Sequence, residues 1–331
     1  MTSRGRLILL GVLACAACAP VPGAGAVGPP LPSSASGRAG AVAPGGTERI
    51  LARRAGQDTL VTVVRRRDRR LLRSRRIEGR WTVSAATVEG GTTGLSADGG
   101  VLALARPPRI FPPRGTQLAV LDARELLVRR RISLPGFFTV DAISPDGSWL
   151  YLIQYAGGDA FDYRVRALDT RTGRLAARPV VDPREPGEQM GGLPLTRTMS
   201  RDGRWAYTLY GGGEEMFIHA LDTVGRTAAC IDLDMLPTHG DLAGYRLSVS
   251  ADGGRIDVQR RGSVVATVDA RTFAVSEPGA AATSQQESPA ARRRTSAATA
   301  DGGGFPWWVL LPAAGLCVLV ARTVARRAPP E

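Results

Sequence analysis

The chain has 331 residues and a formal net charge of +13, and all 43 of its basic residues are arginine. This length allows one large domain or two ordinary ones. Aromatic residues make up only 5% of the chain, so the stacking platforms that usually accompany base recognition are scarce, and nucleic acid is not an expected partner.

Residues 1–26 have the order of a secretory signal peptide. Two arginines precede the short apolar run 7–13, and small residues follow it. Two cleavage sites remain open. Val12-Leu13-Ala14-Cys15 resembles a lipobox, which would make Cys15 the lipidated first residue, whereas Ala24-Gly25-Ala26 suits ordinary cleavage.

A linker and a repeated body follow the signal. Residues 27–40 are rich in Pro, Gly, Ala and Ser, which predicts a flexible linker. A unit of about 50 residues then recurs through residues 41–276. Its clearest copy contains Ser144-Pro145-Asp146-Gly147 between two apolar runs. This pattern predicts two strands joined by a tight turn, because Gly adopts positive φ and Asp caps the turn.

Related turns give the period of the repeat. They stand at Ser96–Gly99, Ser200–Gly203 and Ser250–Gly253, with a degenerate copy at Ala43–Gly46. The third positions of the five turns are 53, 48, 56 and 50 residues apart. Fixed-period similarity of this kind is typical of repeat architectures.

A second motif recurs with the first. Asp169-Thr170-Arg171-Thr172-Gly173 predicts another turn, and residues 62–64 near Asp68 take its place in the first unit. The other related positions are Asp122, Asp222 and Asp269. In the clearest unit the pattern predicts four antiparallel strands. These strands are expected over 138–143, 149–154, 163–168 and 175–181.

The body resembles the YVTN/WD40-like β-propeller superfamily, which includes TolB-like and quinoprotein-like propellers. Residues 144–151 with 169–173 are similar to the pattern that recurs once per blade in that superfamily, whereas the Asp222 copy is shortened and the Asp269 copy lacks Gly. The resemblance implies an all-β fold, here a propeller of about five four-stranded blades. Six or seven blades are more usual, so an unrecognised blade or an open ring remain alternatives. Propellers host many functions, so the resemblance implies no particular activity.

The recurrent turn residues are expected to be structural, with each Asp capping its own turn. A ring of catalytic carboxylates is the less favoured interpretation. The structural set is Asp98, Asp146, Gly147, Asp202, Gly203, Asp252 and Gly253. His239 and Asp241 form a candidate ligand loop, where His239 is either a base or metal ligand or a surface residue. His219 is expected to be a packed strand residue, and no catalytic residue, metal site or cofactor is predicted.

Arginines also cluster between residues 65 and 80. One interpretation is a solvated strand pair, and the other is a patch that contacts an anionic wall polymer or lipid. The candidate contacts are Arg65, Arg66, Arg67, Arg69 and Arg70. Cys230 is expected to be a small buried residue.

The C-terminal region predicts a membrane anchor. Residues 277–304 have the composition of a disordered linker, and residues 305–321 carry no charge, as expected of a transmembrane helix. Three arginines in the tail 322–331 indicate a cytoplasmic C-terminus. The layout is typical of a bacterial secreted protein held in the cell membrane by a single span, with the propeller on the extracytoplasmic side.

The sequence thus favours a non-enzymatic, membrane-tethered binding or scaffold module for a protein or cell-envelope component. One alternative is a propeller hydrolase or lyase acting on an envelope or extracellular small molecule. It is less favoured because the sequence has one loop histidine and no cluster of metal ligands. The other alternative is an electrostatic binder of anionic wall polymer or lipid.

Overall fold

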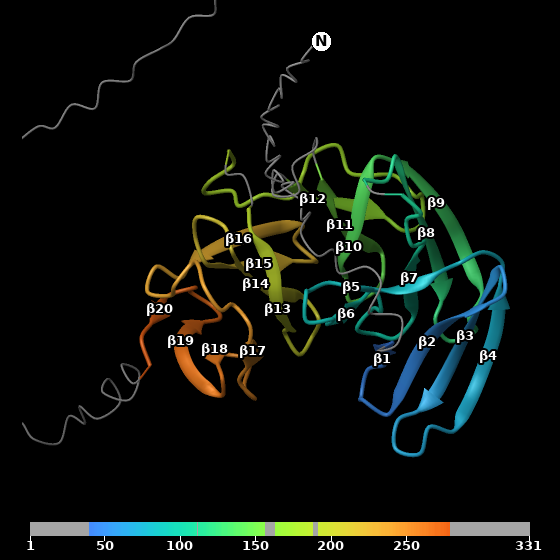
Figure 1. The fold of residues 1–331 in the computed structure, drawn as a ribbon, viewed down its shortest axis with the longest axis horizontal. Coiled ribbons are helices and arrows are strands. Elements are labelled where there is room, and N and C mark those ends of the chain that lie inside the picture. Colours follow the sequence, from blue (N-terminus) through green and yellow to red (C-terminus); the bar gives the residue numbers. More distant parts are fainter. Residues whose placement is uncertain (1–39, 111, 156–162, 188–190, 279–331) are drawn as a thin grey trace, which may run out of the picture. The chain divides into compact units, whose positions relative to one another are not determined.

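The computed structural model describes residues 40–110, 112–155, 163–187 and 191–278, and all regular structure in them is β-strand. The strands form five antiparallel sheets that follow one another along the chain (Figure 1). The predicted signal peptide, transmembrane helix, cytoplasmic tail and nearly all of both linkers lie outside the described residues. Within the described residues no helix is long and apolar enough to cross a membrane.

The first, fourth and fifth sheets each contain four strands in chain order. The first sheet consists of β1 (Ala41–Val42), β2 (Glu48–Ala55), β3 (Asp58–Arg65) and β4 (Leu71–Ile77). The fourth consists of β13 (Leu193–Met199), β14 (Trp205–Gly211), β15 (Phe217–Asp222) and β16 (Thr227–Asp232). The fifth consists of β17 (Tyr245–Val249), β18 (Arg255–Arg260), β19 (Ser263–Asp269) and β20 (Val275–Ser276).

The second sheet has five strands instead of the predicted four, in the order β6-β5-β7-β8-β9. The extra strand belongs to a short β5–β6 hairpin at one edge of the sheet, where β5 pairs with both β6 and β7. The strands are β5 (Thr82–Ala85), β6 (Thr92–Thr93), β7 (Val101–Ala105), β8 (Gly115–Asp122) and β9 (Val128–Pro135).

The third sheet has three strands, β10 (Phe137–Ile143), β11 (Trp149–Tyr155) and β12 (Tyr163–Asp169). The fourth strand predicted over 175–181 makes only two isolated bridges, Leu168 with Leu175 and Val165 with Val180. The two bridges are three positions apart on β12 and five positions apart on the partner segment. The surplus residues must bulge, and Pro179 among them has no N–H to donate.

Alternating side chains decide which face of each strand is buried. In β12, Tyr163, Val165 and Ala167 are buried, whereas Arg164 and Arg166 on the other face are not. Successive residues of a strand point to opposite faces of the sheet. The alternation of apolar and polar residues in the sequence therefore places the apolar side chains on one face, which packs against a neighbouring sheet.

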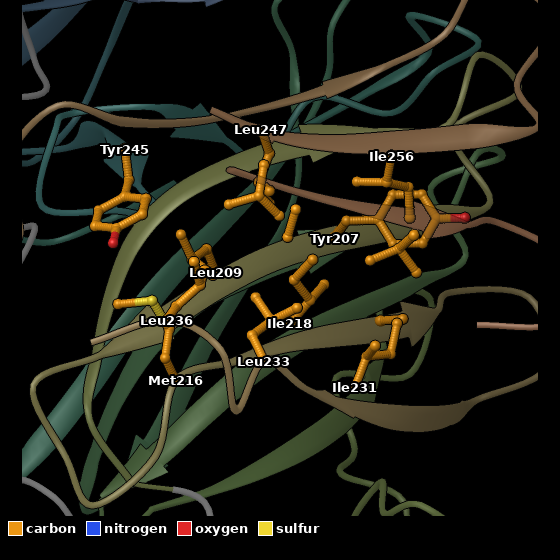
Figure 2. Packing of buried hydrophobic residues seen from close by; sticks show 14 of the residues in the cluster. Tyr207, Leu209, Met216, Ile218, Ile231, Leu233, Leu236, Tyr245, Leu247 and Ile256 are labelled. Atoms are coloured by element: carbon orange, nitrogen blue, oxygen red, sulfur yellow. The ribbon is translucent and has the colours of Figure 1, made fainter. Parts of the chain in front are cut away.

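Hydrophobic clusters join the sheets in chain order. The first and second, second and third, third and fourth, and fourth and fifth sheets share clusters. Figure 2 shows the cluster of the fourth and fifth sheets, where Leu209 and Ile218 lie with Leu247 and Ile256. Burying one such side chain contributes about 1.5–3 kcal/mol. Among the described residues, none of these clusters contains side chains of both the first and the fifth sheet.

Candidate functional site

The Ser-x-Asp-Gly turns are closed by their own side chains. Ser144 Oγ donates to Asp146 Oδ1 at 2.6 Å and accepts from Trp149 N at 2.9 Å. Asp146 Oδ1 also accepts from Ser148 N at 3.0 Å. Gly147 follows at φ 73° and donates to the Ser144 carbonyl at 2.9 Å. The Asp146 carboxylate is therefore occupied within its own turn.

The other three copies repeat this geometry. The Ser Oγ to Asp Oδ1 distances are 2.5 Å at Asp98, 2.6 Å at Asp202 and 2.5 Å at Asp252. Burial acts to raise the pKa of Asp146, but hydrogen bonds from Ser144 and Ser148 outweigh it and lower the pKa. The hydrogen bond from Ser200 likewise lowers the pKa of Asp202. The Asp146 and Asp202 carboxylates are therefore ionised at neutral pH, and all four Asp side chains act as acceptors within their turns.

The turns of the second, third and fourth sheets pack against one another. A Cβ at Gly147 would lie 2.3 Å from Val101 Cγ2 of the second sheet, and a Cβ at Gly203 would lie 2.5 Å from Ala97 Cβ. The turns also share a backbone hydrogen bond, from Asp98 N to the Pro145 carbonyl at 3.0 Å. Glycine at these two positions thus allows a close approach as well as a positive φ.

The second recurrent motif holds the first one in place. Asp169 Oδ1 accepts from Arg171 N at 2.8 Å and from Thr172 N at 3.0 Å. Thr170 Oγ1 then donates to the Gly147 carbonyl at 2.7 Å. Asp122, Asp222 and Asp269 each accept two backbone N–H groups in the same way. Both motifs therefore lie at one end of each sheet.

A cavity of about 560 Å³ opens at this end, lined by residues of the first four sheets. We call it the turn cavity. Thr92, Thr93 and Thr198 contribute hydroxyl groups to its lining. The charged side chains among its described lining residues are Arg197 and Arg201. This lining favours an anionic group over a cation.

Arg197 is held in a buried ion pair. Its Nη2 bonds Asp141 Oδ1, its Nη1 bonds the Asp141 carbonyl, and its Nε donates to Thr208 Oγ1 at 2.8 Å. The exposed side-chain fractions are 8% for Arg197 and 1% for Asp141. Among the described residues none hydrogen-bonds Asp141 Oδ2. Arg201, in contrast, is exposed at the cavity and carries its charge toward solvent.

The β5–β6 hairpin ties the second sheet to the others. Val88 N donates to the Pro194 carbonyl of the fourth sheet at 2.9 Å. Glu89 pairs with Arg246 of the fifth sheet. Thr92 Oγ1 donates to the Gly40 carbonyl at 3.0 Å, beside the first sheet. This hairpin was not predicted from the sequence, although Gly90-Gly91 is a turn signal that could have indicated it.

In the candidate ligand loop, Asp241 pairs with Arg261 and not with His239. Asp241 Oδ2 accepts from Arg261 Nη2 at 2.5 Å, and Asp241 Oδ1 accepts from Ala243 N at 3.0 Å. The hydrogen bond from Ala243 N, followed by that from Arg261, lowers the pKa of Asp241. His239 is exposed in the same loop.

The candidate patch arginines occupy the turn between β3 and β4. Arg65 and Arg67 lie 3.2 and 3.8 Å from Asp68, and Arg66 donates to the Gly46 carbonyl at 2.7 Å. Arg69 has a φ of 58°, and Arg69 and Arg70 are exposed. The basic surface extends beyond this turn, because residues 48–77 of the first sheet hold eleven arginines and three carboxylates.

His219 and Cys230 lie on two paired strands of the fourth sheet. His219 in β15 is buried, which lowers its pKa to about 4. Cys230 in β16 is half-buried, whereas the sequence predicted a small buried residue. The part of the chain that the structure describes contains no group of three or more His, Cys, Asp or Glu side chains placed to hold a metal ion.

No protein-family model matches the chain, and no curated protein matches its sequence. Among solved structures, hydrazine synthase from Kuenenia stuttgartiensis aligns over 72% of this chain and 70% of its own, at 14% identity and a TM-score of 0.43. A functionally unknown protein from Desulfotomaculum acetoxidans aligns over 72% and 67%, at 14% identity and a TM-score of 0.44.

TolB from Acinetobacter baumannii aligns over 69% of this chain and 50% of its own, at 14% identity and a TM-score of 0.40. The chain thus spans half the length of that protein. Within the molecule itself, the repeated antiparallel sheets with the same two turns support the predicted β-propeller fold.

Proposed function

We propose that the chain is a membrane-tethered, extracytoplasmic binding module whose turn cavity receives an anionic group of a protein or cell-envelope component. The observation that carries this proposal is the lining of the cavity. Four sheets converge on it, and its charged described residues are Arg197 and Arg201.

The two arginines would contribute differently to the binding of an anionic group. Arg197 is already oriented by Asp141 and Thr208, so binding need not fix its side chain again. Arg201 is exposed and supplies positive charge at the opening. A guanidinium can hold a carboxylate or phosphate through two parallel hydrogen bonds, which are stronger than bonds between neutral groups.

Binding of a fluorescent oligoglutamate to the detergent-purified full chain tests the proposal. Arg201→Gln is expected to weaken binding by about 10-fold or more, because a hydrogen bond to a charged group contributes about 1.5–3 kcal/mol. The matched control is Arg76→Gln, which removes the same charge from a side chain that is 65% exposed on β4. Equal weakening by both variants would show that the cavity has no special role.

The first sheet supports a second candidate, the electrostatic binder of anionic wall polymer or lipid. Its turn and outer strand expose Arg67 at 80% and Arg76 at 65%. In the same titration, weakening by Arg67→Gln and Arg76→Gln with no effect of Arg201→Gln would favour this candidate. Such binding should also fall steeply between 0.05 and 0.5 M salt, on the order of tenfold or more, because exposed charges are screened.

The tether is a separate part of the proposal and has its own test. Residues 305–321 are uncharged and arginines follow them. A reporter that works only in the cytoplasm, fused after Glu331, should therefore be active. A reporter that works only outside the membrane should be silent at the same position, and the opposite pattern would refute this orientation.

A further inference from the structure

The repeat shows which side chains of the turn cavity belong to one sheet alone. In four copies of the turn, the second position holds a small residue or proline. These residues are Pro44, Ala97, Pro145 and Ala251. In the fourth sheet this position is Arg201, and the position three residues before the turn is Arg197, where no other copy has an arginine. The turns at Asp98, Asp146 and Asp252 close without either arginine, so the turn itself does not explain them.

The charge at the cavity matches one negative charge. Arg197 is neutralised by Asp141, whereas Arg201 is exposed, and the described lining of the cavity holds no carboxylate. Asp141 and Thr208 use three of the five N–H groups of Arg197, which leaves two for a ligand. A carboxylate carries one charge, whereas a phosphate monoester carries about 1.5 to 2. The arginines therefore suit a carboxylate better than a phosphate.

Apolar side chains also line the cavity. The residue directly before the turn is apolar in all five copies, and four of these residues are part of the lining. They are Val42, Leu95, Ile143 and Met199. Val42 of the first sheet and Met199 of the fourth are 41% and 38% exposed. Exposed apolar side chains that share a cavity with a few polar groups are typical of a binding site for a ligand with an apolar part.

Two threonine hydroxyls favour a ligand that has amide groups. Thr92 Oγ1 donates to the Gly40 carbonyl at 3.0 Å, and Thr93 Oγ1 donates to the Asp141 carbonyl at 2.8 Å. A hydroxyl has one proton, so both oxygens can now only accept. A peptide backbone supplies N–H donors for them. An ionised fatty acid has no donor, so it could not replace the hydrogen bonds of any water that it displaced.

We propose that the turn cavity binds the free C-terminal carboxylate of a protein whose last residue is apolar. This inference rests on the proposed function, because it uses the same cavity and the same two arginines. Arg201 and the remaining N–H groups of Arg197 receive the carboxylate, the apolar residues before the turns contact the last side chain, and the threonine oxygens accept backbone N–H groups. The volume of about 560 Å³ lies within the range of about 300–1,000 Å³ that is usual for ligand pockets.

Three peptides that differ in one group each test this inference against the detergent-purified full chain. The parent peptide is rhodamine-labelled Gly-Ser-Gly-Ser-Leu with a free carboxylate. The second peptide has a C-terminal amide, and the third ends in Ser instead of Leu. Fluorescence anisotropy is expected to show about 10-fold or more weaker binding for each change. The first change removes a charged hydrogen-bonding group, and the second removes a buried apolar side chain.

Two variants assign these losses to the two parts of the cavity. Arg201→Gln should lose most of the preference for the free acid over the amide and keep the preference for Leu over Ser. Met199→Ser should show the reverse pattern, because it removes an apolar contact and no charge. Met235→Ser is the matched control and should bind as the parent chain does, since Met235 is 42% exposed and is not part of the cavity lining.

The remaining outcomes separate this inference from the proposed function. Suppose that the peptides ending in Leu and Ser bind equally, or that the acid and the amide do, while oligoglutamate binding still depends on Arg201. That result would overturn the inference and leave the proposed function standing. An Arg201→Gln variant that weakens neither the parent peptide nor oligoglutamate would overturn both. Decanoate that binds as tightly as the parent peptide, measured by competition, would indicate a fatty acid ligand and overturn the inference alone.

Discussion

At the scale of single residues, the same glycine of the repeated Ser-x-Asp-Gly turn has different neighbours in different sheets. Gly147 and Gly253 occupy the same position in their turns, with φ of 73° and 77°. A Cβ at Gly147 would lie 2.3 Å from Val101 Cγ2, whereas a Cβ at Gly253 would meet nothing within 4 Å. The turn sequence is nearly the same in both copies, so only the neighbouring sheet distinguishes them.

Gly147→Ala is therefore expected to destabilise the protein by about 2–5 kcal/mol, from the left-handed backbone and from overpacking against Val101. Gly253→Ala should lower the free energy of unfolding by only about 1–2 kcal/mol, from the backbone alone. Urea denaturation of both variants measures the difference. If the two losses are equal, the turn of the third sheet does not pack on the second as described.

His219 makes stability depend on pH. Burial holds its folded-state pKa at about 4, below the ordinary value of 6.5. Between these values the unfolded chain binds a proton that the folded chain does not, so the free energy of unfolding falls as pH is lowered from about 6.5 to 4. His219→Gln should flatten this dependence in urea denaturation at pH 7, 6 and 5. His239→Gln should leave the slope unchanged, because that ring is exposed.

At the scale of elements, the Asp141–Arg197 pair connects β10 and β13, the first strands of the third and fourth sheets. Both side chains are at least nine-tenths buried. Removing one partner leaves the other charge buried without compensation, so Arg197→Met should destabilise by about 3–5 kcal/mol. Adding Asp141→Leu to Arg197→Met should recover much of this loss. Thermal and urea unfolding of the single and double variants measure the recovery.

An exposed ion pair serves as the control. Arg76 and Asp58 lie 3.7 Å apart, and the Arg76 side chain is 65% exposed. Arg76→Ala should change the free energy of unfolding by about 1 kcal/mol or less, because exposed pairs are screened. A double variant of the buried pair that is no more stable than Arg197→Met would show that the pair is not held by mutual compensation.

The strands themselves were largely predictable from local pattern. The predicted strands 138–143, 149–154 and 163–168 correspond to β10, β11 and β12 within one residue at each end. The prediction of a fourth strand in that unit was only partly met. Pro179 and the surplus residues before it cannot follow the register of β12, so the segment forms two isolated bridges instead of a strand. The β5–β6 hairpin was missed because β6 has only two residues, too few to show alternation.

The candidate sites were less predictable than the strands, because their residues are brought together by tertiary contacts between positions far apart in the sequence. Arg197 is one of 43 basic residues, and its partner Asp141 lies 56 positions away. Asp241 looked available to His239, but the turn between β18 and β19 brings Arg261 to it. His219 was correctly placed in a strand, yet its cross-strand neighbour Cys230 depends on the β15–β16 register.

At the scale of the whole molecule, the first and fifth sheets share a described hydrophobic cluster with one other sheet each, whereas the middle sheets share clusters with two. Less buried apolar area means that these sheets open at smaller free energy. Native-state hydrogen exchange should therefore show lower opening free energies for amides of β18 and β19 than for those of β7, β8 and β11. Uniform protection in all five sheets would contradict this expectation.

The β5–β6 hairpin has a consequence for the order of events during folding. Glu89 meets Arg246 across 157 residues of sequence, so this contact forms only after nearly the whole body has left the ribosome or collapsed. Closing so long a loop is slow, and contacts of this kind are usually absent from the folding transition state. The hairpin is therefore expected to slow unfolding more than it speeds folding, and so to lengthen the lifetime of the native state.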